Sequence, residues 1–295
     1  MRFSNFYALA LVASAAWAQA PRLDVLPVQG DVYMLVSPNG NFALQAGRDG
    51  ALLVDTPSPE YSNAVMAEIR RITPKPLRHI INTSGDTDRV SGNAALSALG
   101  QPGLNNNRQG ATVMAQENVL TRMTKEEVAS ELLPIDEYFL PTKDFYFNGE
   151  PIIMIHAPKA HTDGDTIVFF RRSDVVAVGD LFNPTRYPVI DIPHGGSVKG
   201  LIDALNQILR ITVPERLQDG GTRVIPAHGR LCNEADIVEY REMVTIIRDR
   251  VQDMIKRGLT LAQVKAGKPS LDYDPQYGNP DAFVEAVYKS LGGRQ

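Results

Sequence analysis

Short apolar runs separated by turn residues dominate the first part of the chain. Residues 31–55 contain the runs DVYMLV, NFALQA and ALLVD, and the glycine, asparagine and aspartate between them are typical of hairpin turns. At 58–72 the apolar positions recur every three or four residues, which predicts a helix. The apolar run LRHIINT that follows predicts a buried strand.

The second half of the chain repeats this order of strands followed by helices. The runs DFYFNGEPIIMIHAP and TIVFFRRSDVVAVGDLF predict two hairpins, which turn at NGE and at RRSD. A predicted helix at 198–209 and the strand TRVIPAHG complete this block. Two sets of strands, each followed by helices, predict two sheets packed face to face with helices outside them, a sandwich of α/β type.

A long helix is predicted where the strand pattern ends. From Asn233 to Gly258 the apolar positions again recur every three or four residues, Asn233 is suited to cap the start, and Gly258 suits the end. We therefore divide the chain into a domain at 19–232 and a C-terminal helical extension at 233–295 that packs on it. A coiled-coil partner for the long helix stays open as the alternative.

The first eighteen residues have the pattern of a secretory signal. Arg2 precedes the apolar run YALALVASAAW, which is too short to span a bilayer, and Ala16-Trp17-Ala18 offers a small-x-small cleavage site. We expect residues 1–18 to be a signal peptide and the protein to be exported, periplasmic or secreted. The single cysteine, Cys232, cannot form a disulfide within the chain, so stability has to come from the core or from a metal.

Charge and composition narrow the class of partner. The chain has 34 acidic and 30 basic residues, a formal net charge of -4, and no block of like charges. Neither nucleic acid nor, after signal cleavage, a membrane is therefore expected as a partner. We expect a small-molecule substrate, and the sequence leaves the oligomeric state open.

Four short motifs at the ends of predicted strands carry the candidate chemistry. They are SGDTDR at 84–89, HTDGD at 161–165, GDLF at 179–182 and PAHG at 226–229. Carboxylates and imidazoles are ligands for divalent ions, and strand ends on one edge of a sandwich can converge. Taken singly, each residue also has an ordinary role in a turn, a helix cap or a hydrogen bond. Because unpaired carboxylates are costly to bury, Asp86 and Asp88 need a cation beside them, either a metal ion or Arg89.

The motif set resembles the metallo-β-lactamase superfamily. The resemblance runs over about residues 25 to 232, through a hairpin ending in Asp55 and the segments INTSGDTDRVSGN, HTDGDT, VGDLF and IPAHG. It implies an αββα four-layer sandwich with one or two divalent metal ions, most often zinc, at one edge. It also implies that His161 helps to hold the first metal, that Asp88 and His228 help to hold the second, and that Asp180 bridges the two or ligates the second.

The opening motif departs from the His-x-His-x-Asp-His that the family usually has. Ser84 and Asp86 stand in place of two first-site histidines, and Arg89 stands where many members have a second-site histidine. We expect an impaired first site, with Ser84 at best a weak ligand, and a second site to which Asp86 adds an oxygen. A ligand set richer in oxygen adds manganese and iron to zinc as candidate metals.

The resemblance implies a hydrolase activity, and two hypotheses follow. The first is an exported metal-dependent hydrolase in which a metal-bound hydroxide, oriented by Asp88, attacks an ester, thioester or amide-like bond. The alternative is a non-catalytic protein of the same fold, with a metal-free site held by an Asp-Arg network, that binds a small molecule or a partner.

A second, weaker candidate site precedes the predicted helix at 198–209. The backbone amides of Gly195, Gly196 and Ser197 could receive an anionic group of a substrate, with Lys199 nearby. A plain helix start is the alternative interpretation of the same residues.

Overall fold

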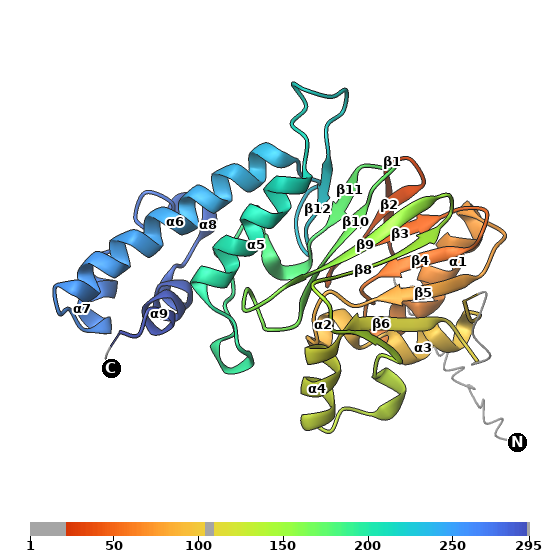
Figure 1. The fold of residues 1–295 in the computed structure, drawn as a ribbon, viewed down its shortest axis with the longest axis horizontal. Helices are drawn as coiled ribbons and strands as arrows, with labels where there is room; N and C mark the ends of the chain where they lie inside the picture. The colour runs from red at the N-terminus through yellow and green to blue at the C-terminus, as the bar shows by residue number, and fades with distance from the viewer. Residues whose placement is uncertain (1–21, 104–108, 294–295) are drawn as a thin grey trace, which may run out of the picture.

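The computed structural model describes residues 22–103 and 109–293, which form two β-sheets packed face to face with helices outside both (Figure 1). The predicted signal peptide at 1–18 lies outside the described residues. Within the described ranges, no helix is both long enough and apolar enough to cross a membrane.

The first sheet has seven strands whose order in the sheet follows the order in the chain. The strands β1 to β4 pair antiparallel, whereas β4 to β7 pair parallel. Their bounds are β1 (Asp24–Gln29), β2 (Val32–Ser37), β3 (Gly40–Ala46), β4 (Ala51–Val54), β5 (Leu77–Ile81), β6 (Thr112–Gln116) and β7 (Asp136–Tyr138).

The second sheet has five strands in the order β12-β11-β10-β9-β8. All of its pairs are antiparallel except β11 with β12, and the hairpins predicted at NGE and RRSD are confirmed. The bounds are β8 (Thr142–Phe147), β9 (Glu150–Ala157), β10 (Asp165–Phe170), β11 (Val175–Ala177) and β12 (Arg223–Ile225).

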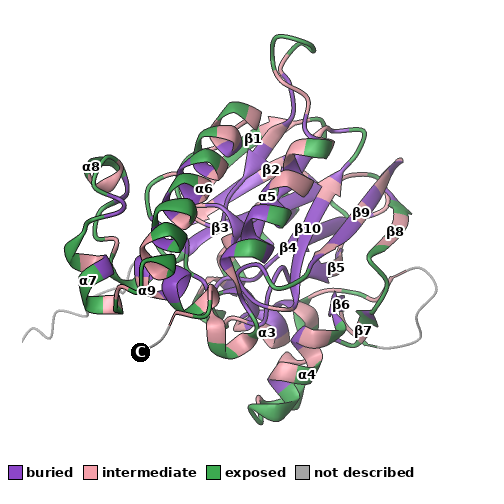
Figure 2. Ribbon diagram, turned by 60° about the vertical axis from the view of Figure 1, so that its left-hand side comes forward, coloured by how far each residue is buried: buried purple, intermediate pink, exposed green. Residues whose placement is uncertain are grey.

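Three apolar layers hold the sandwich together. Side chains such as Met34 and Ile81 of the first sheet meet Met154 and Phe170 of the second between the sheets. The other face of the first sheet is covered by α1 (Ser62–Ile72) and α3 (Asn93–Leu99), and that of the second by α5 (Val198–Ile211) and α6 (Glu234–Lys256). Figure 2 shows the buried sheets between helices whose outer faces are exposed. The predicted αββα four-layer sandwich is confirmed.

The remaining helices are short. They are α2 (Thr87–Val90), α4 (Glu117–Lys125), α7 (Leu261–Ala266), α8 (Asp274–Tyr277) and α9 (Asp281–Ser290), with 3-10 turns η1 (Pro59–Tyr61), η2 (Ser130–Leu132), η3 (Gly179–Leu181) and η4 (Ile192–His194). In Figure 1 α7, α8 and α9 lie with α6 at one end of the molecule.

The long predicted helix is confirmed as α6, and its apolar stripe is buried by its own chain. Ile237, Tyr240 and Ile247 are fully buried in a cluster that also contains residues of α5 and α9. A capping box starts the helix, because the Asn233 side chain accepts from the Asp236 backbone N–H and Asp236 accepts from that of Asn233. The division of the chain at residue 232 stays a prediction.

The directions of the strands explain why the four motifs share one edge. Asp55 and Ser84 follow the parallel strands β4 and β5, so they lie at the same edge of the first sheet. Asp180 and His228 likewise follow the parallel strands β11 and β12. His161 precedes β10, which runs antiparallel to β11, and therefore lies at that same edge of the second sheet.

Replacing Asn233 with alanine tests the local origin of α6. The change removes the side-chain acceptor for the first turn, and we expect it to lower the free energy of unfolding by about 1 kcal/mol in urea denaturation. Asn63, which is exposed within α1, gives a matched Asn63→Ala control that we expect to be close to neutral. Equal effects of the two substitutions would contradict a capping role.

Candidate metal centre

The chain that leaves β5 and forms α2 carries three charged side chains of different exposure. Asp86 has extended backbone just before α2, and the first turn of that helix carries Asp88 and Arg89. The Asp88 side chain is 45% exposed, whereas that of Arg89 is fully buried. Neighbouring positions on one short helix thus place a carboxylate at the surface and a guanidinium beneath it.

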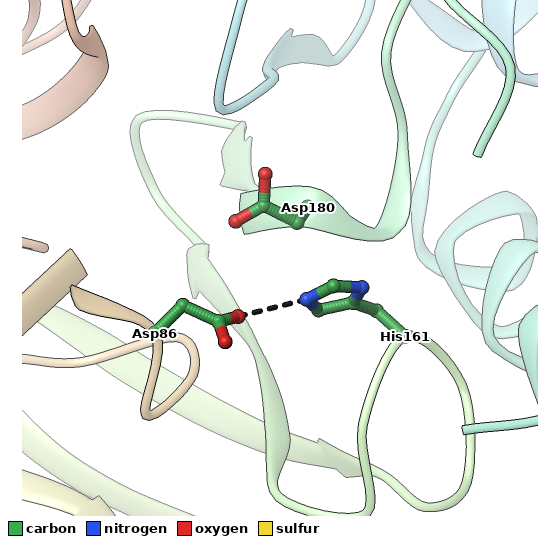
Figure 3. A group of neighbouring side chains, drawn as sticks. All are labelled: Asp86, His161 and Asp180. Atoms are coloured by element: carbon green, nitrogen blue, oxygen red, sulfur yellow. Dashed lines mark hydrogen bonds and ion pairs between the residues drawn. The ribbon is translucent and has the colours of Figure 1, made fainter. Parts of the chain in front are cut away.

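All five residues predicted as ligands lie together. They form two groups, in each of which the candidate ligand atoms lie within 4.8 Å of one another, and Asp180 belongs to both. The first group is Asp86, His161 and Asp180, of which Figure 3 shows Asp86 and His161 pointing toward each other with Asp180 beside them, and the second is Asp88, Asp180 and His228. Metal binding by these residues stays a prediction.

In the first group, His161 and Asp86 hydrogen-bond directly to each other. His161 Nε2 lies 2.8 Å from Asp86 Oδ2, and His161 Nδ1 donates to the Val189 carbonyl at 2.9 Å. Burial alone would lower the pKa of His161, but the hydrogen bond to Asp86 and the nearby carboxylates raise it to about 10. Although burial acts to raise the pKa of Asp86, its bonds to His161 and Ser84 hold it well below the usual range.

The carboxylate of Asp86 has two further partners. Ser84 Oγ donates to its Oδ2 at 2.8 Å, and Arg122 of α4 lies 3.0 Å from its Oδ1. Arg122 also contacts Glu126, which lies 2.9 Å from His194 Nε2. The sequence interpretation missed Arg122, because the residue lies within an ordinary amphipathic helix and no motif signals its approach to Asp86.

Arg89 is the cation shared by the carboxylates of Asp88, Asp180 and Asp55. Its Nη2 donates to Asp88 Oδ2 at 2.8 Å, and its Nε lies 3.2 Å from Asp180 Oδ2. Asp55 Oδ2 lies 3.9 Å from its Nη1. Burial acts to lower the pKa of Arg89, but the charges of Asp180, Asp55 and Asp88 raise it above its usual value, so the group stays protonated.

Two of the three ligand separations in the second group suit one shared divalent ion. His228 Nε2 lies 3.9 Å from Asp88 Oδ2 and 3.8 Å from Asp180 Oδ1, so these atoms do not hydrogen-bond to one another. Two ligands with metal bonds of about 2.1 Å can be up to roughly 4.2 Å apart, so these separations suit a shared ion.

The state of the ligand atoms agrees with this fit. Arg89 Nη2 lies 3.3 Å from His228 Nε2, and because arginine can only donate, that nitrogen is unprotonated. Its lone pair faces Arg89 in this structure, and a metal ion would take the place of this contact. Burial, and then the charge of Arg89, lower the pKa of His228. Asp180 Oδ2 is buried without a hydrogen bond among the described residues, since its 3.2 Å ion pair with Arg89 is poorly aligned.

Two buried aspartates fix the loops that carry the ligands. Asp55 accepts from the Thr83 backbone N–H at 2.7 Å and from its hydroxyl at 2.6 Å, and these bonds hold Asp55 at a left-handed φ of 63°. Asp165 accepts from the Thr162 N–H and hydroxyl, both at 2.7 Å. Burial raises the pKa of each aspartate to about 7.

The second candidate site has mainly structural contacts. Ser197 Oγ caps α5 by accepting from the Gly200 N–H at 3.0 Å, and Lys199, with an 83% exposed side chain, pairs with Asp203 of the same helix. Gly195 has a left-handed φ of 85°, and Gly196 packs so closely on the His161 carbonyl that a Cβ would clash. A role in binding an anion stays a prediction.

Comparison with known proteins identifies the architecture. The family model described as the metallo-beta-lactamase superfamily matches residues 38–216. The stereoselective inverting sec-alkylsulfatase Pisa1 from Pseudomonas sp. superposes with a TM-score of 0.70 at 16% identity, over 92% of this chain and 51% of that one. The chain therefore spans about half the length of this sulfatase, and the match extends past residue 232 into the C-terminal helices.

β-Lactamases give a second set of structural matches. The DIM-1 metallo-beta-lactamase has a TM-score of 0.61 at 15% identity, over 77% of this chain and 99% of that one. The metallo-beta-lactamase from Pontibacter korlensis has a TM-score of 0.60 at 15% identity, over 76% and 99%. At such low identity these likenesses concern the fold alone. No curated protein sequence matches the chain.

Replacing Arg89 with methionine tests how much the site depends on its guanidinium. The change leaves Asp55 and Asp180 without their buried counter-charge, and we expect a loss of about 3–5 kcal/mol in the free energy of unfolding of chelator-treated protein. Arg257, which forms an exposed pair with Asp253, provides the Arg257→Met control, for which we expect less than about 1 kcal/mol. A cost for Arg89→Met no larger than that of the control would contradict the role of Arg89.

The pair of His161 and Asp86 predicts a specific pH dependence in chelator-treated protein. Because the pKa of His161 is raised from 6.5 to about 10, its contribution is complete below pH 6.5 and is lost as the pH rises through 10. The lowered pKa of Asp86 keeps its contribution present above its usual value of 3.8. We expect urea denaturation to separate wild type from His161→Gln more widely at pH 6 than at pH 10.5. An equal separation at both pH values would contradict this coupling.

Proposed function

Because this chain belongs to the metallo-β-lactamase superfamily, we propose that it is a metal-dependent hydrolase that acts on an ester, thioester or amide-like bond. The proposal rests on the geometry of the second group. Asp88, Asp180 and His228 come from three separate segments, yet their ligand atoms face one another without bonding to one another. We propose that this group holds one divalent ion, zinc, manganese or iron.

The residues of the second group have distinct roles in this proposal. A divalent ion held by Asp88, Asp180 and His228 would supply Lewis acidity and would activate a water for attack on the substrate. Arg89 holds Asp88 by Oδ2, which leaves Oδ1 of this half-exposed carboxylate to orient that water and accept its proton. Asp180, at 20% exposure, is the more enclosed carboxylate and serves as a ligand.

The first group has a different role. Asp86 and His161 are bonded to each other, and Arg122 neutralises the other oxygen of Asp86. This closed arrangement supports a protein that works with a single ion. Arg122 and the imidazole of His161 then present positive charge at the border of the site, where negative charge would develop on the substrate during hydrolysis.

The structural neighbours support the class of reaction. Both the sec-alkylsulfatase and the β-lactamases are hydrolases, and the first is named for an alkyl sulfate, which is an ester of sulfuric acid. We propose an ester-type bond on this basis. We also propose export to the periplasm or beyond the cell, because the pattern of residues 1–18 is that of a signal peptide.

One observation favours the alternative of a non-catalytic binding protein. Each carboxylate of the two groups already has a guanidinium nearby, since Arg89 lies within 3.2 Å of both Asp88 and Asp180 and Arg122 lies 3.0 Å from Asp86. Such an Asp-Arg network compensates the charge without an ion. In this alternative the fold recognises a small molecule or a partner and performs no reaction.

Metal content and turnover together separate the two functions. We expect protein purified without chelators to contain about one divalent ion per chain and to hydrolyse some members of a panel of esters, thioesters and lactams. Asp88→Ala removes a ligand and the proton acceptor, so we expect it to lower kcat by at least about 100-fold and to weaken metal binding.

Asp144 supplies the matched control for this experiment. It is exposed on the edge strand β8, and Asp144→Ala should leave both metal content and turnover unchanged. Protein with no metal, and with an unchanged melting temperature after addition of Zn, Mn or Fe ions, would favour the binding protein. Full activity of Asp88→Ala would contradict the proposed role of this residue.

A further inference from the structure

The segment that follows Asp180 encloses a cavity together with the C-terminal helices. Residues 185–190 form one side, and α8 and α9 with the turn between them form the other. The volume of about 590 Å³ falls in the range of sites that bind small molecules. Its apolar lining is formed by Tyr187, Val189, Ile190, Tyr277, Phe283 and Ala286.

Aromatic rings give this cavity its chemical character. Tyr187 stacks on Phe283 with ring centroids 5.4 Å apart and an angle of 11° between the planes, and Tyr277 lies 5.4 Å from Tyr187 on another side. The Tyr187 hydroxyl donates to Asp274 at 2.8 Å, so its polar atom is already satisfied. Among the described lining residues Arg186 is the only charged one. Such a lining suits an apolar ligand.

The same segment also borders the candidate metal centre. The carbonyl of Val189 accepts the hydrogen bond from His161 Nδ1 at 2.9 Å. Pro184 and Thr185 pack on Gly229, the residue after His228, since a Cβ on Gly229 would lie 2.8 Å from Pro184 Cγ. One stretch of chain thus lines the cavity on one side and, on the other, touches His161 of the first group and Gly229, the neighbour of His228.

A second pocket near the centre is lined by more charged side chains. It lies between α4 and η4, has a volume of about 510 Å³, and is lined by the charged side chains of Arg122, Lys125, Glu126 and Asp163 together with His194. An apolar group would have to desolvate these charges in order to enter. The aromatic cavity is therefore the better place for the apolar part of a ligand.

We propose that the cavity formed by residues 185–190, α8 and α9 binds the alkyl or aryl part of the substrate. Val189 lines the cavity, is 65% exposed and holds His161 through its carbonyl, so the reactive bond lies beyond the rim formed by Val189, toward the metal centre. This inference rests on the proposed hydrolase function and gives it a substrate class, an ester with an extended apolar moiety. It also gives the C-terminal helices a role in selecting the substrate.

Binding of a neutral apolar fluorophore tests the cavity without any need for turnover. 1-N-Phenylnaphthylamine carries no charge, so the charged side chains of the metal centre do not attract it. We expect a saturable rise of its emission with wild-type protein. Ala282 lines the cavity from an exposed position on α9, so Ala282→Trp should fill the space and raise the Kd at least about tenfold.

Two further variants test whether a loss of fluorophore binding has a cause other than filling of the cavity. Ala262 is exposed on α7 outside the cavity lining, so Ala262→Trp should leave the Kd within about twofold of wild type. Val189, with 65% exposure, lines the cavity, and Val189→Asp should weaken binding without filling the space. No saturable binding, or equal losses in Ala282→Trp and Ala262→Trp, would overturn the proposal.

Hydrolysis of esters of different chain length tests whether the cavity binds part of the substrate. We expect Ala282→Trp to lower kcat/KM for 4-nitrophenyl octanoate relative to the acetate by about tenfold, and Ala262→Trp to leave this ratio unchanged. Asp88→Ala should lose turnover yet keep the fluorophore bound, which separates the failure of the reaction from the failure of the cavity. Fluorophore binding with no effect of Ala282→Trp on the chain-length ratio would overturn the assignment to substrate.

Discussion

The buried guanidinium of Arg89 is the interaction on which the rest of the site depends. Asp55, Asp88 and Asp180 come from three segments at one edge of the sandwich, and their charges would repel one another without a cation between them. Arg89 is fully buried, so its own charge is tolerated only because these carboxylates surround it. The burial of Arg89 therefore depends on the three aspartates, and the close approach of the aspartates depends on Arg89.

The two ligand groups show how one change of residue type alters a metal centre. An aspartate at position 86 forms an ion pair with Arg122 and a hydrogen bond with His161, and both contacts consume ligand atoms. The second group retains atoms that face one another without bonding. The two groups therefore differ in whether the candidate ligands bond to one another, because both have an arginine beside their carboxylates.

The C-terminal helices pack on the sandwich and also line the cavity to which we assign the apolar part of the substrate. Helix α6 buries its apolar stripe on α5 and α9, and α9 forms part of the aromatic cavity beside residues 185–190. Val189 in that segment accepts the hydrogen bond from His161, so the segment contacts both the C-terminal helices and the imidazole. In the substrate-binding role proposed for the cavity, changes in these helices alter ligand selection without changing any of the candidate metal ligands.

Local patterns in the sequence determined the strands β2 to β5, the two hairpins of the second sheet and the helix α6 with its cap at Asn233, because periodicity and turn chemistry act over a few residues. The metallo-β-lactamase fold was implied by the resemblance of the motif set to that superfamily. The same resemblance implied that Asp88, Asp180 and His228 are partners, and the strand directions in the structure explain why these residues share an edge. Only the tertiary structure decided that Arg122 would reach Asp86, that His161 would bond to Asp86, and that α9 would close a cavity over Tyr187. These contacts join segments that are distant in the chain, and periodicity specifies which face of an element is buried but not which side chain of another element meets it.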